Sequence, residues 1–293
     1  MNTDIRIAVC TNRSPAAVVD CLTALREQVG DGPLLLVTSG LAEPEVEAHR
    51  AAFGGTVLAE PDVGLSRARN RALQAGGEVI AFVDDDAVVA PGWWDALRRR
   101  WDEAPAEVAC IGGPIRPRYS VEPPRWFSGG IAHTLTLLDR GSSVRDLDPR
   151  AEAVYGANIS FRTEPVRDLG GFDPTLGHSG TRVFFAEEDE MQRQLVRAGY
   201  RVRYVPDAAV WHVIPAERLT RRSFMRRRFA FGTTVGMRRE RSRGVAARQL
   251  VASMAGALLA TLVRRPALAM ERAVRAAENA GVLYGSTRPR LIA

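Results

Sequence analysis

Apolar residues in the first hundred positions follow two alternating patterns. Short apolar runs, of the length of a buried strand, are each followed by a longer segment with apolar residues at helical spacing. The expected strands span residues 5–10, 34–37, 56–59 and 79–83, and the expected helices span residues 15–28, 44–53, 66–75 and 93–101. This alternation predicts an α/β fold with a mostly parallel sheet and helices on both faces. In such sheets ligands bind beyond the carboxyl ends of the strands.

The pattern changes in the second half of the chain. Residues 115–150 contain several prolines around Trp126 and predict a long irregular segment. We expect this segment to border the substrate, with a peripheral excursion that packs Trp126 into the core as the alternative. Further expected elements are a helix at 187–198, strands at 201–204 and 210–213, and helices at 217–243, 246–263 and 267–280. We therefore expect one domain over residues 1–215 and a helical extension, basic and then apolar, over residues 216–293.

Composition excludes several classes of protein. The chain is 46% hydrophobic and 25% charged, which is ordinary for a globular protein, and its net charge is +6. All 40 basic residues are Arg, which excludes a mechanism that needs a catalytic Lys. Cys10, Cys21 and Cys110 lack paired spacing, which favours a reducing compartment and argues against a zinc finger. The polar N-terminus runs straight into a strand, so we expect no signal peptide and a cytoplasmic protein.

Three consecutive carboxylates, Asp84, Asp85 and Asp86, directly follow the expected strand at 79–83. Such carboxylates repel one another and lose hydration energy, and Mg²⁺ or Mn²⁺, which prefer oxygen ligands, offset both costs. Residues i and i+2 of an extended chain point the same way, so Asp84 and Asp86 can share one cation. Because Mg²⁺ fills open positions with substrate phosphates, the triplet predicts an enzyme that handles a metal-bound diphosphate. An acidic turn in water is the alternative.

A second acidic cluster, at residues 187–190, opens an expected helix, where the helix dipole favours carboxylates whatever their role. At about 100° per residue, Glu188 shares a face with Met191 and Leu195, the apolar stripe that packs inward. An inward carboxylate at a helix N-terminus is a candidate general base. His212, in a short apolar segment, is either a hydrogen-bonded structural residue or a third metal ligand, since imidazole binds Mn²⁺ beside carboxylates.

Seven segments, in order along the chain, resemble the family 2 glycosyltransferases, which have the GT-A fold. The matching segments are residues 7–13, 64–70, 84–86, 156–162, 170–173, 187–190 and 211–212. Residues 84–86 resemble the family's metal-binding Asp-x-Asp motif, and residues 187–190 resemble the start of its catalytic-base helix. Each segment alone is a weak signal, but their shared order over about residues 5–214 makes the resemblance specific.

The resemblance implies inverting, metal-dependent transfer of a sugar from a nucleoside diphosphate sugar to a hydroxyl or other nucleophile, with Mn²⁺ or Mg²⁺ as cofactor. Counted back from Gly199, Glu188 falls where the family places its base, and Asp189 is the rival if the register slips by one. The implied metal ligands are Asp84, Asp86 and His212. The implied nucleotide and donor residues are Thr11, Asn12, Arg13, Asp62, Arg69, Asp84, Asp85, Gly156, Ala157 and Asn158.

One departure from the family concerns base recognition. The family usually ends its second strand with an Asp that reads the base, whereas this strand ends in Thr38-Ser39-Gly40. Glu60 or Asp62, after the third strand, is the candidate replacement. UDP, GDP and dTDP therefore remain open as the nucleotide, as do the sugar, the acceptor and the linkage.

Two other classes fit part of the pattern. A nucleotidyltransferase would also bind a metal diphosphate, but it normally carries a Gly-rich, Lys-bearing loop, which residues 11–15 are not. A nucleic-acid-binding protein would explain the Arg-rich segment 217–243, yet base-reading side chains are sparse there.

The C-terminal region raises the question of a membrane. Residues 250–263 form the longest apolar stretch, interrupted by Ser253 and Thr261, which suits a buried or interfacial helix better than a membrane span. Because an Arg-dense helix precedes this stretch, we expect it to contact an anionic membrane surface. A solvated basic face and a homodimer through these helices are the alternatives. The sequence leaves the acceptor open among a saccharide, a lipid-linked molecule and a small metabolite.

Overall fold

The computed structural model describes residues 3–179, 182–183 and 187–290. The chain forms two compact units. The first contains the described residues within 1–117, 138–180 and 187–213, and the second contains those within 118–137, 181–186 and 214–293.

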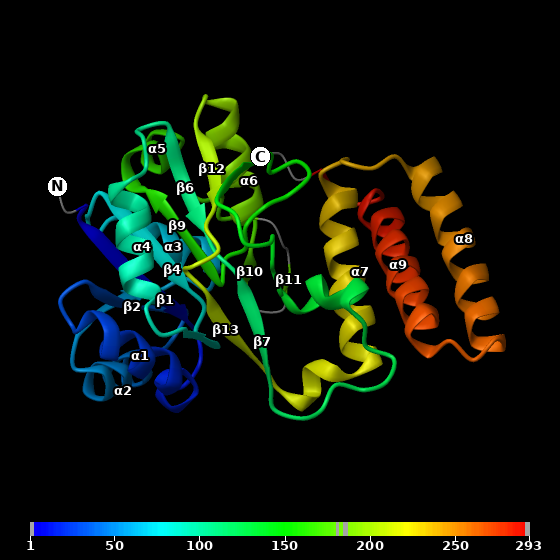
Figure 1. Cartoon of the computed structure of the whole chain (residues 1–293), viewed down its shortest axis with the longest axis horizontal. Helices are drawn as coiled ribbons and strands as arrows, with labels where there is room; N and C mark the ends of the chain where they lie inside the picture. The colour runs from blue at the N-terminus through cyan, green and yellow to red at the C-terminus, as the bar shows by residue number, and fades with distance from the viewer. Residues whose placement is uncertain (1–2, 180–181, 184–186, 291–293) are drawn as a thin grey trace. The chain divides into compact units, whose positions relative to one another are not determined.

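An eight-stranded sheet forms the centre of the first unit (Figure 1). Its strands, in spatial order, are β3 (Thr56–Glu60), β2 (Leu34–Ser39), β1 (Ile5–Thr11), β4 (Val79–Val83), β9 (Asn158–Arg162), β6 (Val108–Gly112), β12 (Arg201–Tyr204) and β8 (Arg145–Leu147). Strands β3, β2, β1 and β4 are parallel, as are β6 and β12, whereas β9 and β8 are antiparallel to their neighbours. The predicted α/β fold with a mostly parallel sheet is confirmed.

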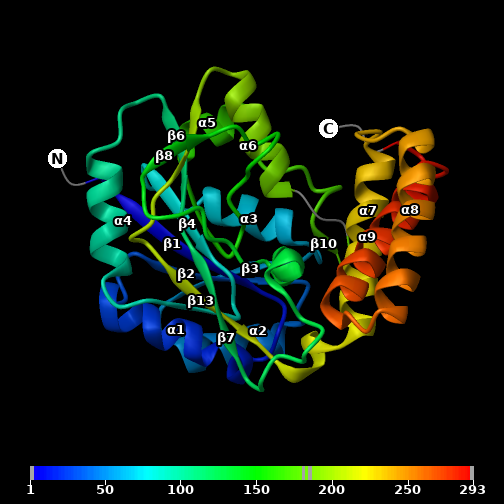
Figure 2. The same cartoon turned by 45° about the vertical axis from the view of Figure 1, so that its right-hand side comes forward.

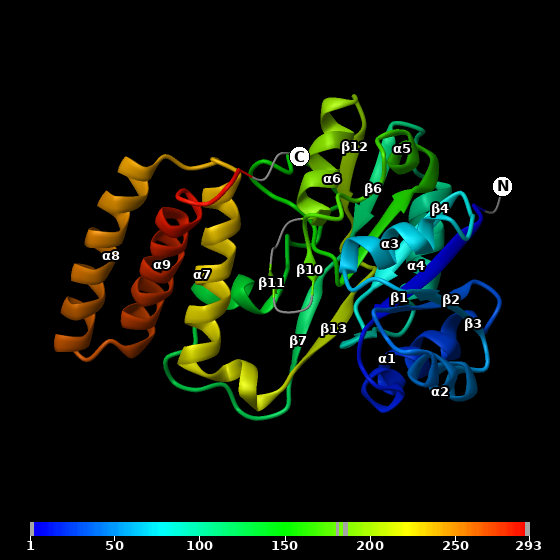
Figure 3. The ribbon, with the colours of Figure 1, turned by 180° about the vertical axis from the view of Figure 1, so that it is seen from behind.

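Helices lie on both faces of this sheet, with α4 on one face and α3 and α6 on the other (Figures 1 and 3). The helices of this unit are α1 (Pro15–Val29), α2 (Glu43–Phe53), α3 (Leu65–Leu73), α4 (Trp93–Asp102), α5 (Thr163–Asp168) and α6 (Glu187–Arg197). Trp93 and Trp101 of α4 are buried against the sheet, and their indole N–H groups donate to Asn158 and Ser160 of β9 at 3.1 and 2.9 Å. Two large buried side chains thus keep their polar atoms paired.

A second, three-stranded sheet joins β5 (Ala87–Val89), β13 (Val210–Ile214) and β7 (Ile115–Tyr119). Strand β13 runs antiparallel to β5, and this register sets His212 opposite Ala87. Because Ala87 directly follows the aspartate triplet, this pairing brings His212 beside the triplet. Two further strands, β10 (His178–Ser179) and β11 (Arg182–Val183), have two residues each.

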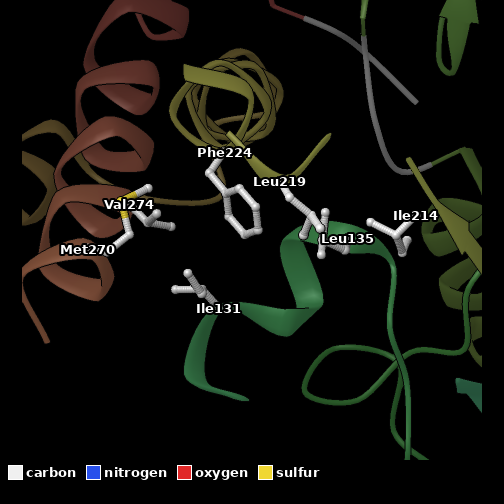
Figure 4. Packing of buried hydrophobic residues seen from close by; sticks show 7 residues of the cluster. All are labelled: Ile131, Leu135, Ile214, Leu219, Phe224, Met270 and Val274. Atoms are coloured by element: carbon white, nitrogen blue, oxygen red, sulfur yellow. The ribbon is translucent and has the colours of Figure 1, made fainter. Parts of the chain in front are cut away.

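The second unit is mainly helical, and its three long helices stand side by side in Figures 1 and 3 and overlap in the view of Figure 2. They are α7 (Arg221–Met237), α8 (Arg243–Leu262) and α9 (Pro266–Gly285), and the short 3₁₀ helices η1 (Gly129–Leu135) and η2 (Ala216–Leu219) complete the unit. Figure 4 shows its buried apolar cluster, in which Phe224 of α7 packs with Ile131 of η1 and Met270 of α9. Trp126 packs edge to face on Phe224 at 5.3 Å, so this part of the irregular segment contributes to the unit's packing.

Helices α7 and α9 approach backbone to backbone. A Cβ atom added at Gly232 would lie 2.0 Å from the carbonyl oxygen of Glu278, and one added at Gly281 would lie 2.1 Å from that of Phe229. Glycine is therefore required at these contacts for steric reasons.

Candidate active site

The aspartate triplet lies where parallel strands β1 and β4 end side by side. Thr11, the last residue of β1, donates its hydroxyl hydrogen to Asp85 at 2.5 Å, and Arg13 contacts the same carboxylate at 3.3 Å. The Thr11 hydroxyl in turn accepts the backbone N–H of Arg13 at 3.0 Å. Three residues that the sequence assigned to the nucleotide therefore form one connected group.

Asp86 faces His212 across the β5–β13 pairing. The Nε2 atom of His212 lies 3.2 Å from Oδ1 of Asp86, and the imidazole is buried. The backbone carbonyl of Asp86 also accepts the N–H of Val213 at 2.9 Å, which holds the two strands in this register. The structure thus brings together two of the three predicted metal ligands.

Asp84, the third predicted ligand, is electrostatically strained. Burial, together with the charge of Asp86, raises its pKa to about 6, against the opposing effect of the Arg69 guanidinium. A divalent cation held by these carboxylates would relieve this strain. The carboxylate oxygens suit Mg²⁺ or Mn²⁺, and an imidazole beside carboxylates suits Mn²⁺. Among the described residues, no three His, Cys, Asp or Glu side chains are already gathered as a metal centre.

Arg69 of α3 connects the triplet to the second acidic cluster. Its side chain is almost fully buried, with Nη1 2.8 Å from Oε1 of Glu187 and 3.8 Å from Oε2 of Glu188, and Nη2 3.9 Å from Oδ1 of Asp84. The guanidinium carbon lies 5.4 and 5.6 Å from the ring centroids of Phe82 and Phe172. Because a buried cation is stable only with partners, these groups define one position for the guanidinium.

The burial of the acidic cluster differs from the helical-face prediction, which placed Glu188 innermost. The side chain of Glu187 is 4% exposed and that of Glu188 is 17% exposed, and Glu190 is also buried. Arg69 accounts for the difference, because its charge makes an inward position favourable for Glu187. Burial and the charge of Glu188 raise the pKa of Glu187 well above its ordinary value, against the effect of Arg69.

Glu188 faces the loop before β9. Its Oε1 atom accepts the backbone N–H of Gly156 at 3.2 Å, and a Cβ atom added at Gly156 would lie 2.3 Å from Nη2 of Arg69. Gln192, one turn further along α6, exchanges two hydrogen bonds with the backbone of Val154 at 3.0 and 2.9 Å. These bonds hold the loop and α6 together around a carboxylate that keeps partial solvent access.

Four predicted donor residues lie away from this group or serve the core. The side chain of Asn158 is buried and bonds to Trp93, Pro114 and Ala208, and Ala157 is fully buried. Asn12 is exposed, and Asp62 is exposed and pairs with Arg67 at 3.1 Å. Asp189, the rival base, is half-buried.

Two contributors were missed at the sequence level. Buried His49 makes a 2.8 Å hydrogen bond from Nε2 to the carbonyl oxygen of Arg13, which fixes the loop after β1. Glu187 is the buried partner of Arg69. A lone His at a helix position carries no distinguishing pattern, whereas the four acids in a row were a visible signal that needed a buried Arg to interpret.

Comparison with known proteins identifies the family to which this chain is similar. Residues 79–272 match the family described as glycosyl transferase family group 2. The succinoglycan biosynthesis protein ExoM of Rhizobium meliloti is 29% identical over 301 residues, which cover 96% of this chain and 92% of ExoM. The glucosyl-dolichyl phosphate glucuronosyltransferase of Haloferax volcanii is 30% identical over 151 residues, which cover 51% of this chain and 47% of the relative.

A solved structure supports the fold independently. The mannosyltransferase PcManGT from Pyrobaculum calidifontis, in complex with GDP-Man and Mn²⁺, superposes with a TM-score of 0.58 at 18% identity. The match covers 94% of this chain and 87% of the mannosyltransferase.

Proposed function

Because the chain belongs to glycosyltransferase family group 2, we propose that it is an inverting enzyme, in which the sugar of a nucleoside diphosphate sugar passes to a nucleophile, usually a hydroxyl, of a glycan or lipid-linked acceptor. Two relatives support these substrates: ExoM is named for succinoglycan biosynthesis, and the Haloferax volcanii relative is named for a glucosyl-dolichyl phosphate substrate. The sequence does not favour the nucleotidyltransferase alternative, because residues 11–15 after the first strand do not form a Gly-rich, Lys-bearing loop.

In the proposed site, Asp84, Asp86 and His212 are the residues that would hold Mn²⁺ or Mg²⁺. When bound, the cation supplies Lewis-acid stabilisation to the departing diphosphate. Thr11 and Arg13 hold the Asp85 carboxylate, which faces the nucleoside.

In the acceptor half, Glu188 takes the proton of the acceptor hydroxyl as that oxygen attacks the anomeric carbon. Arg69 and the N–H of Gly156 hold the Glu188 carboxylate in position, and Glu187 holds Arg69. Glu60, the last residue of β3, or Asp62, just after that strand, reads the nucleotide base.

One observation carries this proposal. A single buried guanidinium, that of Arg69, lies within 4 Å of a carboxylate from the triplet and of carboxylates that open α6. The diphosphate end and the acceptor end of a displacement must be within a few ångströms of one another, and this arrangement meets that requirement.

Metal-dependent donor binding is the test of the proposed site. We expect Asp86→Ala to lose most of the affinity for a nucleoside diphosphate that depends on Mn²⁺, measured by calorimetric titration with and without chelator. Asp20→Ala, which removes an exposed carboxylate of α1, is the matched control. Affinity that is the same for both variants, or that ignores the chelator, contradicts the metal assignment.

We also propose that the enzyme works in the cytoplasm as a peripheral protein at an anionic membrane surface. The basic and apolar residues of the second unit support this location, and a lipid-linked acceptor would be presented there. A homodimer through the C-terminal helices is the alternative use of the same residues.

A further inference from the structure

Helix α8 turns its small residues inward and its large apolar residues outward. Its buried residues are Ala246, Ser253 and Ala260, which repeat every seven positions along one face. The outer face is defined by side chains that are each more than half exposed: Val251, Met254, Leu258, Leu259, Leu262 and Val263. A helix that faces water has the reverse arrangement.

The outer face of α8 is bounded by positive charge at both ends. Arg243 and Arg248 lie in its first turns, and Arg264 and Arg265 directly follow its end. No acidic residue occurs between positions 240 and 271. The segment therefore combines exposed apolar surface with uncompensated basic charge.

The length of the outer face distinguishes lying on a membrane from crossing it. Among the described residues, α8 is the one helix long and apolar enough to cross a membrane, with a mean hydropathy of 1.5. Its outer face, from Val251 to Val263, extends over about 18 Å at 1.5 Å per residue. The hydrocarbon core of a bilayer is about 30 Å thick. A helix that lies in the interface fits this face better than one that spans.

A groove of about 590 Å³ opens at the end of this face, where α8 turns into α9 beside the start of α7. Leu258 belongs to both the outer face and the groove, and Met225 and Met270 line it from α7 and α9. The remaining apolar lining consists of Ala257, Pro266, Ala269 and Ala273.

Three exposed arginines, Arg221, Arg264 and Arg265, also line the groove. Within the part of the chain that the structure describes, none of their side chains has an ion-pair or hydrogen-bond partner. An apolar groove with unpaired guanidinium groups is complementary to an amphiphile with an anionic head, because one guanidinium group can donate two parallel hydrogen bonds to two phosphate oxygens.

We propose that the outer face of α8 lies in the headgroup region of an anionic bilayer and that the groove takes one anionic phospholipid. The lipid phosphate lies among Arg221, Arg264 and Arg265, and its first methylene groups lie along Met225 and Met270. This proposal rests on the proposed membrane location. It names the protein surface and the lipid ligand that would hold the protein there. A second copy of the chain is a poor occupant, because two α8 faces would bring basic ends together without an acid to pair them.

Vesicle binding by the full chain tests the outer face. We expect binding to vesicles of equal parts phosphatidylcholine and phosphatidylglycerol, and little binding to phosphatidylcholine alone. Arg264→Gln with Arg265→Gln should lower the partition coefficient about 30-fold. The control, Arg116→Gln with Arg150→Gln, makes the same change of charge on the first unit and should bind as the parent does. Equal binding to both vesicles, or equal loss in both variants, overturns the proposal.

Retained lipid tests the groove. After incubation with the mixed vesicles, native mass spectrometry should show one phospholipid per chain, and Ala257→Phe, which fills the groove without changing charge, should lose it. Lipid retention by Ala257→Phe, or an α8-dependent dimer that Leu258→Gln dissociates, overturns the groove assignment. Donor affinity in solution, measured in the same variants, should not change, so a failure here is distinct from a failure of the proposed sugar transfer.

Discussion

Glu188 and Asp189 are adjacent residues with different surroundings. Both side chains are half-buried, but Glu188 accepts the N–H of Gly156 and lies 3.8 Å from Arg69, whereas Asp189 occupies the next position along α6. The residue-level prediction of the base therefore depends on a loop and an arginine that are distant in sequence. The positions of Gly156 and Arg69 in the fold are what favour Glu188 over Asp189 as the base.

We predict that Glu188→Gln lowers sugar transfer by about 10²–10⁴-fold while nucleoside diphosphate affinity is largely retained, since a general base acts on the acceptor. Asp189→Asn is the matched control. Activity measured with a nucleotide-release assay should fall in the first variant alone. A dead Asp189→Asn beside an active Glu188→Gln would shift the register by one, and two active variants would place the base elsewhere.

The raised pKa of Asp84 predicts a pH-dependent stability. Its ordinary value is 3.8 and its pKa in the fold is about 6, so the folded protein holds this proton more tightly than the unfolded chain. The contribution of the Asp84 carboxyl group to the stability of the fold is therefore complete below pH 4 and is lost as the pH rises through about 6.

For the metal-free protein, we expect Asp84→Asn to raise Tm relative to the parent at pH 7.5 by more than at pH 4.5. Added Mn²⁺ should raise the Tm of the parent and have little effect on the variant. Differential scanning fluorimetry with chelator or Mn²⁺ measures both, and Asp20→Asn is the control for an exposed carboxylate. A Tm difference that does not vary with pH refutes the assigned strain.

At the scale of elements, the first four strands of the chain were predicted, whereas β5 to β9 were not. The expected strands at 5–10, 34–37, 56–59 and 79–83 match β1 to β4 within two residues. Strands β1, β2 and β4 give a clear apolar signal because they are largely buried, as parallel strands covered on both faces are. Strands β5, β7 and β8 have three to five residues, and β7 is largely exposed, so their hydrophobic pattern is too weak to identify them. Pairing, not pattern, defines such strands.

The α7–α9 contact is encoded in glycine spacing. Gly232 and Gly236 of α7, and Gly281 and Gly285 of α9, are each four residues apart, and each faces backbone of the other helix. This spacing was visible in the sequence and is a general signal of close helix packing.

We predict that Gly281→Ala destabilises the protein by about 1–3 kcal/mol, since its Cβ atom would lie 2.1 Å from the carbonyl oxygen of Phe229. Gly244→Ala in α8 is the matched control, because its Cβ atom would meet no atom within 4 Å. That change should be neutral or slightly stabilising, as Ala favours a helix. Urea unfolding measures both, and equal stabilities would mean that α7 and α9 do not pack this closely.

At the scale of the whole molecule, the sequence predicted the family but not the association of residues 118–137 with the C-terminal helices. The ordered motifs identify a glycosyltransferase, which the match over residues 79–272 confirms. Residues 118–137 belong with the C-terminal helices, and their prolines gave no sign of this, because the packing partners lie about a hundred residues further on. Long-range packing of an irregular segment has no periodic signature.

The contacts of Arg69 have a consequence for how donor binding and the acceptor side of the site affect one another. In the proposed site, the Arg69 guanidinium stabilises carboxylates on both sides of the reacting bond, so a ligand that changes the charge around Asp84 also changes the electrostatic free energy of Glu187 and Glu188. Such linkage is reciprocal. If donor binding changes the proton affinity of the proposed base, then protonation of that base changes the donor affinity by the same factor. The proposed site therefore predicts that donor binding and the protonation of Glu188 are thermodynamically coupled through the side chain of Arg69.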